Sequence, residues 1–95
     1  MPPLIKTFIH KGLERFFLNG GQAGIRPDHA AKLGRLLTRL NESTAPEDMN
    51  RPGWYFHPLS ADLAGHYSVK VNGNWRMTFR FEDGDAILVD YQDCH

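Results

Sequence analysis

Cysteine is almost missing from this 95-residue chain, which contains only Cys94. One thiol cannot close an internal disulfide or provide the cysteine pair of a zinc site, so a hydrophobic core must hold the fold together. Long apolar runs are missing as well: no stretch approaches the roughly 18 residues that cross a membrane. The first residues also lack the features of an export signal. These absences lead us to expect a cytoplasmic protein with no membrane segment.

An excess of charge of either sign is missing too, because eleven basic and eleven acidic residues cancel. A protein that binds bare nucleic acid through bulk positive charge is therefore excluded, and any contact with RNA must be local. There is no internal repeat and no low-complexity segment, and 41% of the residues are hydrophobic. Length and composition together predict one domain over residues 1–95. His10, His29 and His66 lack neighbours at metal-ligand spacing, so we expect no metal and no cofactor.

The clearest pattern in the chain surrounds the turn dipeptide Asn72-Gly73. Residues on both sides of it alternate between apolar and polar, which predicts a hairpin of the strands His66–Val71 and Asn74–Phe81. One face of this hairpin is apolar, and the other face carries Lys70, Arg76 and Arg80. Solvation of these cations is the simpler explanation of the second face, and RNA contact is the alternative.

Two helices are predicted before the hairpin. Leu13, Phe16 and Phe17 have helical spacing within His10–Leu18, and Asn19-Gly20-Gly21 is typical of a helix end. A longer helix is predicted from Arg26-Pro27-Asp28 to about Asn41, with one apolar stripe of Ala30, Leu33, Leu36, Leu37 and Leu40. Another face of this helix carries the cations Lys32, Arg35 and Arg39, which are either solvated or bind RNA.

The remaining segments complete a fold class. Leu4–Ile9 is either a strand or the lead-in to a helix, and Asn41–Gly53 is predicted to be a connection. Trp54–Leu59 is predicted to be a strand that Pro58 ends or places at a sheet edge. After the hairpin and a turn at 82–85, Ala86–Tyr91 has the apolar character of a last strand. The chain therefore predicts an α+β fold, with two helices packed on one face of a mainly antiparallel sheet of three to five strands.

Four short motifs carry a resemblance to a known family. They are Lys11-Gly12-Leu13-Glu14-Arg15-Phe16-Phe17, His57-Pro58-Leu59, Val71-Asn72-Gly73-Asn74-Trp75-Arg76 and Asp93-Cys94-His95. In this order they resemble the HigB toxins, or plasmid-maintenance killer proteins, of the RelE/ParE superfamily, and the resemblance covers nearly the whole chain. It implies a compact RelE-like fold and the toxin of a type II toxin–antitoxin system.

The resemblance also implies an activity and partners. The expected activity is cleavage of messenger RNA on translating ribosomes, which stops translation and arrests growth. The expected partner is a HigA-like antitoxin with a helix-turn-helix domain, through which alone the toxin would meet operator DNA. Such toxins are expected to be monomers alone and to form a heterotetramer with an antitoxin dimer.

The chemistry that the resemblance implies needs no metal. A ribose 2′-hydroxyl attacks the adjacent phosphate, which requires a base, an acid and a cation. By motif, His57, Asp93 and His95 take the proton-transfer and positioning roles, and Arg76 holds the phosphate. An arginine suits this role because its planar fork can bind two phosphate oxygens. Either histidine can be the base or the acid, so these two roles stay open.

Two positions depart from the family pattern. Cys94 stands where relatives often have tyrosine, and Ser60 stands where some have lysine. We expect both departures to affect activity or codon preference, and Tyr91 is a candidate for the aromatic surface that Cys94 cannot provide. The predicted RNA- and ribosome-binding residues are thus Lys32, Arg35, Arg39, Arg80 and Tyr91.

Two other functions remain open at this point. ParE-like members of the superfamily keep the fold, lack the RNase residues and poison DNA gyrase by binding it. A catalytically weak relative would only bind its antitoxin. Induced expression distinguishes the three, because an RNase stops translation first, a gyrase poison causes DNA damage, and an inactive relative does neither.

Overall fold

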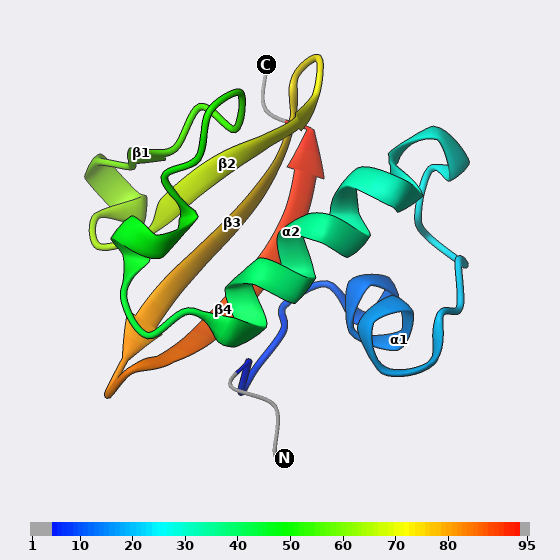
Figure 1. Ribbon diagram of the computed structural model, residues 1–95, viewed down its shortest axis with the longest axis horizontal. Helices are drawn as coiled ribbons and strands as arrows, with labels where there is room; N and C mark the ends of the chain where they lie inside the picture. Colours follow the sequence, from blue (N-terminus) through cyan, green and yellow to red (C-terminus); the bar gives the residue numbers. More distant parts are fainter. Residues whose placement is uncertain (1–4, 94–95) are drawn as a thin grey trace.

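The computed structural model describes residues 5–93. Two α-helices lie on one face of a four-stranded antiparallel sheet in this part of the chain (Figure 1). The sheet order is β1-β2-β3-β4. The elements are α1 (Lys11–Asn19), α2 (Ala30–Glu42), β1 (His57–Pro58), β2 (Tyr67–Asn72), β3 (Trp75–Glu82) and β4 (Asp85–Asp93). The predicted α+β architecture is therefore confirmed.

Both helices begin and end as their local sequence predicts. His10 caps α1, since its Nδ1 accepts a hydrogen bond of 2.9 Å from the Leu13 N–H. Gly20 ends the helix in the left-handed conformation, with a φ of 78° that glycine adopts without a steric penalty. A 3₁₀ turn at Pro27–His29 leads into α2, and the α2 leucines at 33, 36, 37 and 40 are buried in the core.

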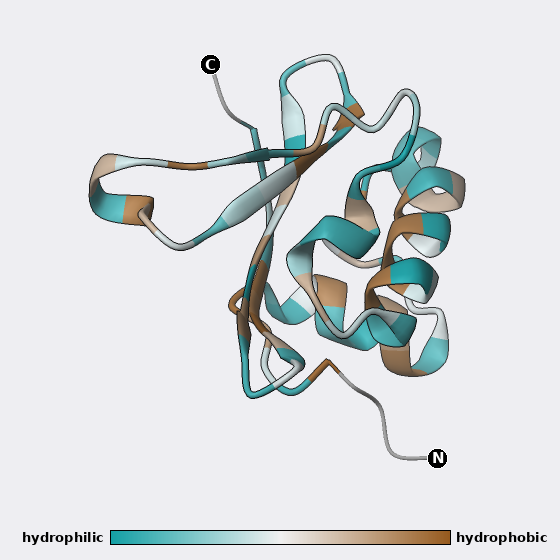
Figure 2. Cartoon of the chain, turned by 60° about the vertical axis from the view of Figure 1, so that its left-hand side comes forward, coloured by the Kyte–Doolittle hydropathy of each residue, from teal (hydrophilic) through white to brown (hydrophobic). Residues whose placement is uncertain are grey.

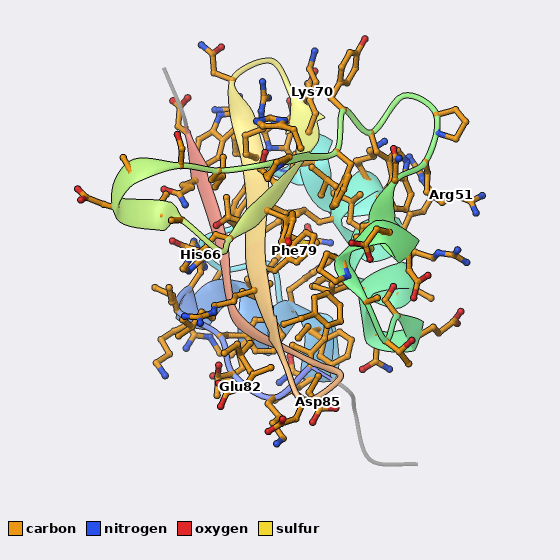
Figure 3. The ribbon with its side chains drawn as sticks, turned by 90° about the vertical axis from the view of Figure 1, so that its left-hand side faces the viewer. Arg51, His66, Lys70, Phe79, Glu82 and Asp85 are labelled. Atoms are coloured by element: carbon orange, nitrogen blue, oxygen red, sulfur yellow. The ribbon has the colours of Figure 1, made fainter. Side chains whose placement is uncertain are left out.

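The hairpin has the register that its alternation predicts. Val69 pairs with Met77 and Tyr67 pairs with Phe79, so the apolar faces of β2 and β3 coincide. Phe79 is fully buried and lies in the middle of the molecule (Figure 3). The core therefore fills the layer between the helices and one face of the sheet, and alternate residues point to the other face, which we call the open face (Figure 2).

Several connecting segments differ from the prediction. The strand predicted over Trp54–Leu59 shrinks to the two residues of β1, because Tyr55 is left-handed, with a φ of 52°, and interrupts the extended backbone. Residues 5–9 are extended beside β4, with single parallel bridges from Ile5 and Phe8. The predicted connection after α2 contains a short 3₁₀ helix, Pro46–Met49.

The segment between β1 and β2 forms an arm over the open face. It carries a 3₁₀ turn at Ala61–Leu63, and the Leu59 N–H donates a 2.8 Å hydrogen bond to the His66 carbonyl at its base. Figure 2 shows this arm on the side of the sheet away from the helices. Within residues 5–93, no helix has the length and apolarity needed to cross a membrane.

Candidate active site

His57 is held in one orientation by two neighbours. Its Nδ1 lies 3.0 Å from the backbone oxygen of Tyr55, and its Nε2 lies 3.3 Å from Ser68 Oγ. A carbonyl oxygen can only accept a hydrogen bond, so Nδ1 carries the hydrogen and the neutral ring accepts at Nε2. Nε2 is therefore the atom at which His57 can take up a proton.

A pocket of about 260 Å³ lies between the arm and the open face. It is lined by His57, Leu59, Leu63, Ser68, Arg76, Thr78 and Gln92. The strand register assembles these residues, because His57 pairs with Ser68, Ser68 with Thr78, and Arg76 with Gln92. Ser68 and Thr78 are only 1% and 3% exposed, so buried hydroxyl groups form part of the pocket lining. The structure thus brings an imidazole and a guanidinium into one pocket.

Arg76 is fixed by the hairpin turn beside it. Its Nη1 donates hydrogen bonds of 2.9 Å to the Gly73 carbonyl and 3.3 Å to the Trp75 carbonyl. Both bonds come from Nη1, and Arg76 also lines the pocket. An anion in the pocket can therefore meet a guanidinium that is already oriented.

Of the other two predicted catalytic residues, the structure describes Asp93, the last residue of β4. Asp93 is exposed and pairs with Trp75, so it lies one position along the strand from the Arg76–Gln92 pair. His95 lies outside the described residues, as does Cys94. Ser60, at the other departure from the family pattern, is exposed at the start of the arm.

Tyr91 is not on the RNA-binding surface that we predicted for it. It pairs with Met77 on the core face, is 3% exposed, and bonds through its hydroxyl to His29 Nδ1 at 2.7 Å. Its ring packs against Trp75, with 4.7 Å between the ring centres. A buried ring cannot stack on an RNA base, so this prediction is wrong. Burial also raises the pKa of Tyr91 above its usual value of 10.0.

Replacing Tyr91 by phenylalanine tests this structural role. At neutral pH we expect a loss of about 1–2 kcal/mol in the free energy of unfolding, because buried His29 loses its hydroxyl partner. Above pH 10 the folded wild type still holds the Tyr91 proton while the unfolded chain releases it. The folded state then binds more protons, so the stability from Tyr91 falls as pH rises. Chemical denaturation between pH 7 and 11 should show the two proteins converging; a constant difference would contradict this assignment.

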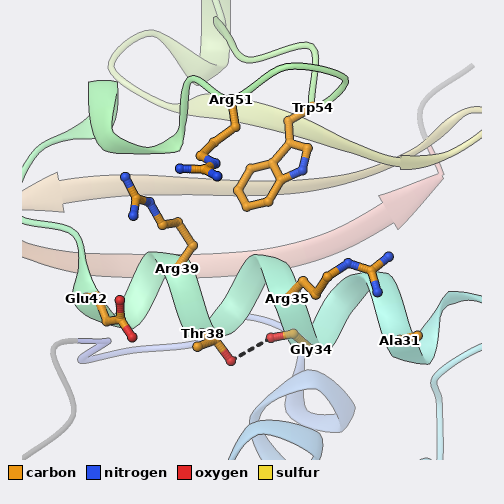
Figure 4. A pocket seen from close by; sticks show the side chains of 8 residues that line it. All are labelled: Ala31, Gly34, Arg35, Thr38, Arg39, Glu42, Arg51 and Trp54. Carbon is orange, nitrogen blue, oxygen red and sulfur yellow. Dashed lines mark hydrogen bonds between the residues drawn. The ribbon is translucent and has the colours of Figure 1, made fainter.

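The predicted cationic face of α2 lies on the helix side of the sheet. Arg35 and Arg39 line a groove of about 530 Å³ between α2 and the segment that carries Arg51 and Trp54 (Figure 4). Arg39 Nε donates a 3.0 Å hydrogen bond to the Asp48 carbonyl. We call this feature the α2 groove.

Lys32 stands beside the α2 groove. Its ammonium lies 5.2 Å from the centre of the Trp54 ring, a cation–π contact. Partial burial lowers the pKa of Lys32, and the nearby charge of Arg35 lowers it further. Arg80 belongs to neither site, because it lines a different pocket with Lys6 and Glu82. The predicted cations are therefore spread over three places.

Sequence reasoning missed four parts of the pocket. Ser68, Thr78 and Gln92 complete its floor, and the Tyr55 carbonyl orients His57. The alternation of Ser68 with the apolar residues on both sides already indicated the open face. Only the strand register shows that Ser68 lies next to His57.

The sequence is similar to proteins of one known family. The family described as the RelE-like toxin of the type II toxin-antitoxin system HigB matches residues 6–95. The chain is 36% identical to Endoribonuclease HigB of Proteus vulgaris over 92 residues, which cover 97% of this chain and 100% of the relative. It is 33% identical to Toxin HigB-1 of Vibrio cholerae over 90 residues, which cover 93% of this chain and 94% of the relative.

Proposed function

The chain belongs to the HigB-like toxins and is an endoribonuclease of a type II toxin–antitoxin system, and we propose that it cleaves messenger RNA on translating ribosomes at the pocket of His57 and Arg76. The observation that carries this proposal is the placement of one imidazole and one guanidinium in the same pocket. Both matched relatives are HigB proteins, which supports the RNase over a gyrase-binding toxin.

The proposed reaction needs only groups of this chain and of the RNA. The ribose 2′-hydroxyl loses its proton, and its oxygen bonds to the adjacent phosphorus. The bond from phosphorus to the 5′-oxygen breaks, and that oxygen takes a proton, which leaves a cyclic phosphate and a 5′-hydroxyl end. His57 exchanges one proton with the RNA at Nε2, and we assign the complementary exchange to His95. Asp93 holds His95 in place.

Arg76 stabilises the charge that builds on the phosphate during this reaction. The guanidinium is already oriented by Gly73 and Trp75, so little reorganisation accompanies the charge build-up. Leu59 and Leu63 add apolar side chains to the pocket lining, and low polarity nearby strengthens an electrostatic contact.

The α2 groove is our candidate for contact with ribosomal RNA, through Lys32, Arg35 and Arg39. Its position on the helix side of the sheet leaves the open face to the message. Arg80 adds a further cation on the strand that carries Arg76. Because the net charge is zero, the toxin depends on such local contacts and acts only where the ribosome presents the message.

A type II toxin has an antitoxin partner. We propose that this partner is a HigA-like helix-turn-helix protein, that two toxins bind one antitoxin dimer, and that operator DNA is reached only through the antitoxin. The cytoplasm, where the ribosomes are, is the proposed location.

Mapping of new 5′ ends on a reporter message in a translation extract tests the proposal. We expect cuts in register with codons that disappear when initiation is blocked, and naked message should remain intact. Rapid cleavage of naked message would contradict ribosome dependence. Intact message together with growth arrest and DNA damage would restore the gyrase-binding alternative, and the absence of all these effects would indicate an inactive relative.

A further inference from the structure

Tyr55 exposes a large aromatic ring in an unfavourable backbone conformation. Tyr55 is 65% exposed, although its neighbours Trp54 and Phe56 are partly buried against the core. Phe56 stacks on Tyr67 with 5.5 Å between the ring centres, and Trp54 faces the α2 groove. The left-handed conformation is sterically unfavourable for an aromatic residue. The core gains nothing from the Tyr55 ring that would offset this cost.

The same residue is tied to the pocket through its backbone, and its ring contacts Lys70. Its carbonyl accepts the hydrogen bond from His57 Nδ1. Lys70 Nζ lies 4.9 Å from the centre of the Tyr55 ring, in a cation–π contact. Lys70 is the cross-strand partner of Arg76 and lies near the hairpin turn (Figure 3). The Tyr55 ring therefore contacts a cation whose cross-strand neighbour, Arg76, lines the pocket.

We propose that Tyr55 and Lys70 form a base-stacking platform that holds a nucleotide next to the cut phosphate. Single-stranded RNA is commonly held by stacking an exposed base on an aromatic ring, with cations on the neighbouring phosphates. With Lys70 against one side of the ring, the base stacks on the side open to solvent, and the ammonium pairs with a phosphate. The platform deepens the proposed function and rests on it.

RNA fits this surface better than a protein segment does. Lys70 and Arg76 are cross-strand partners, so two cations stand side by side, as successive phosphates of an RNA chain require. The platform also supplies the aromatic surface that Cys94 lacks and that buried Tyr91 cannot provide.

The test compares Tyr55→Asn with Tyr55→Phe. Asparagine tolerates the left-handed backbone and keeps the carbonyl that orients His57 but has no ring, whereas phenylalanine keeps the ring. In single-turnover cleavage on programmed ribosomes, we expect Tyr55→Asn to lose about tenfold or more in kcat/KM and Tyr55→Phe to stay within about twofold of wild type. The loss should appear mainly in KM, because the proton-transfer groups are intact. Lys70→Gln should give a smaller loss of the same kind.

Leu18→Asn is the matched control, because Leu18 is 64% exposed but lies on α1, on the other side of the sheet. It should cleave like wild type, and neither Tyr55 variant should have a Tm below the wild-type value, since asparagine tolerates the left-handed backbone and phenylalanine leaves it unchanged. Equal damage from Tyr55→Asn and Tyr55→Phe would overturn the platform, as would wild-type cleavage by Tyr55→Asn. So would a Tyr55→Asn variant that cleaves normally but escapes its antitoxin, since the ring would then serve a protein partner. Normal cleavage by His57→Gln would instead refute the proposed function itself.

Discussion

Replacing His57 by glutamine is expected to slow message cleavage by about 100- to 10,000-fold, the range that one general acid or base contributes. Glutamine can keep a hydrogen bond to the Tyr55 carbonyl but cannot exchange a proton near neutral pH. His57 is exposed and lies in a two-residue strand, so its replacement should leave the fold intact. Single-turnover cleavage in a translation extract measures the rate, and circular dichroism checks the fold.

Ser68→Ala provides a graded comparison for His57→Gln. It removes the hydroxyl 3.3 Å from Nε2 but leaves the Tyr55 carbonyl that sets the tautomer. Loss of one neutral hydrogen bond should reduce the rate by about 2- to 10-fold. A His57→Gln protein that cleaves at the wild-type rate would exclude proton exchange at this residue, whatever Ser68→Ala does.

The helices and the hairpin could be predicted because local sequence specifies them. Gly20 ends α1, and the Asn72-Gly73 turn fixes which residues of β2 and β3 face the core. The shortened β1 could not be predicted in this way. Trp54 contacts Lys32, which lies 22 positions earlier in the chain, and the left-handed Tyr55 separates it from β1. Contacts between distant segments decided that backbone, and the hydrophobic pattern does not contain them.

In the site, too, some features follow from local sequence and others depend on contacts between distant segments. Arg76 lies in the hairpin, which has a strong alternating and turn signal, whereas His57 was named by its family motif alone; the structure places both side chains in one pocket. The prediction for Tyr91 was wrong because the face of the sheet to which Tyr91 points depends on the pairing of β4 with β3. The register of that pairing shifts between Thr78 and Arg80. The buried hydroxyl partner of Tyr91, His29, is 62 residues away. Catalytic roles for Asp93 and His95 stay predictions.

The surroundings of the α2 cations could be predicted only in part. The spacing of Lys32, Arg35 and Arg39 predicts a shared helix face, and these side chains do gather at one groove. Helical spacing could not reveal that Trp54 and Arg51 form the opposite wall, because they come from a connection without a periodic pattern. It also could not show that this groove and the pocket of His57 and Arg76 occupy opposite sides of the sheet.

Arg76→Ala should reduce cleavage by about 100- to 1,000-fold, the effect of removing one oriented group that stabilises developing charge. Arg76→Lys should recover only part of this loss, since a lysine ammonium is a point charge and cannot hold two phosphate oxygens as the fork does. The alanine variant also loses the hydrogen bond to Gly73, so Tm must be measured beside the cleavage rate.

Arg80→Ala decides whether the Arg76 effect is specific. It removes the same charge from the same strand, but Arg80 lines a different pocket. If Arg76 binds the reacting phosphate, Arg80→Ala should lose only about 2- to 5-fold, as expected for an exposed cation. Equal losses from the two variants would mean that the sheet attracts RNA by charge alone, and the pocket would then lose its assigned phosphate ligand. A large loss confined to Arg76 would place the reacting phosphate between Arg76 and His57, because both residues line the same pocket of about 260 Å³.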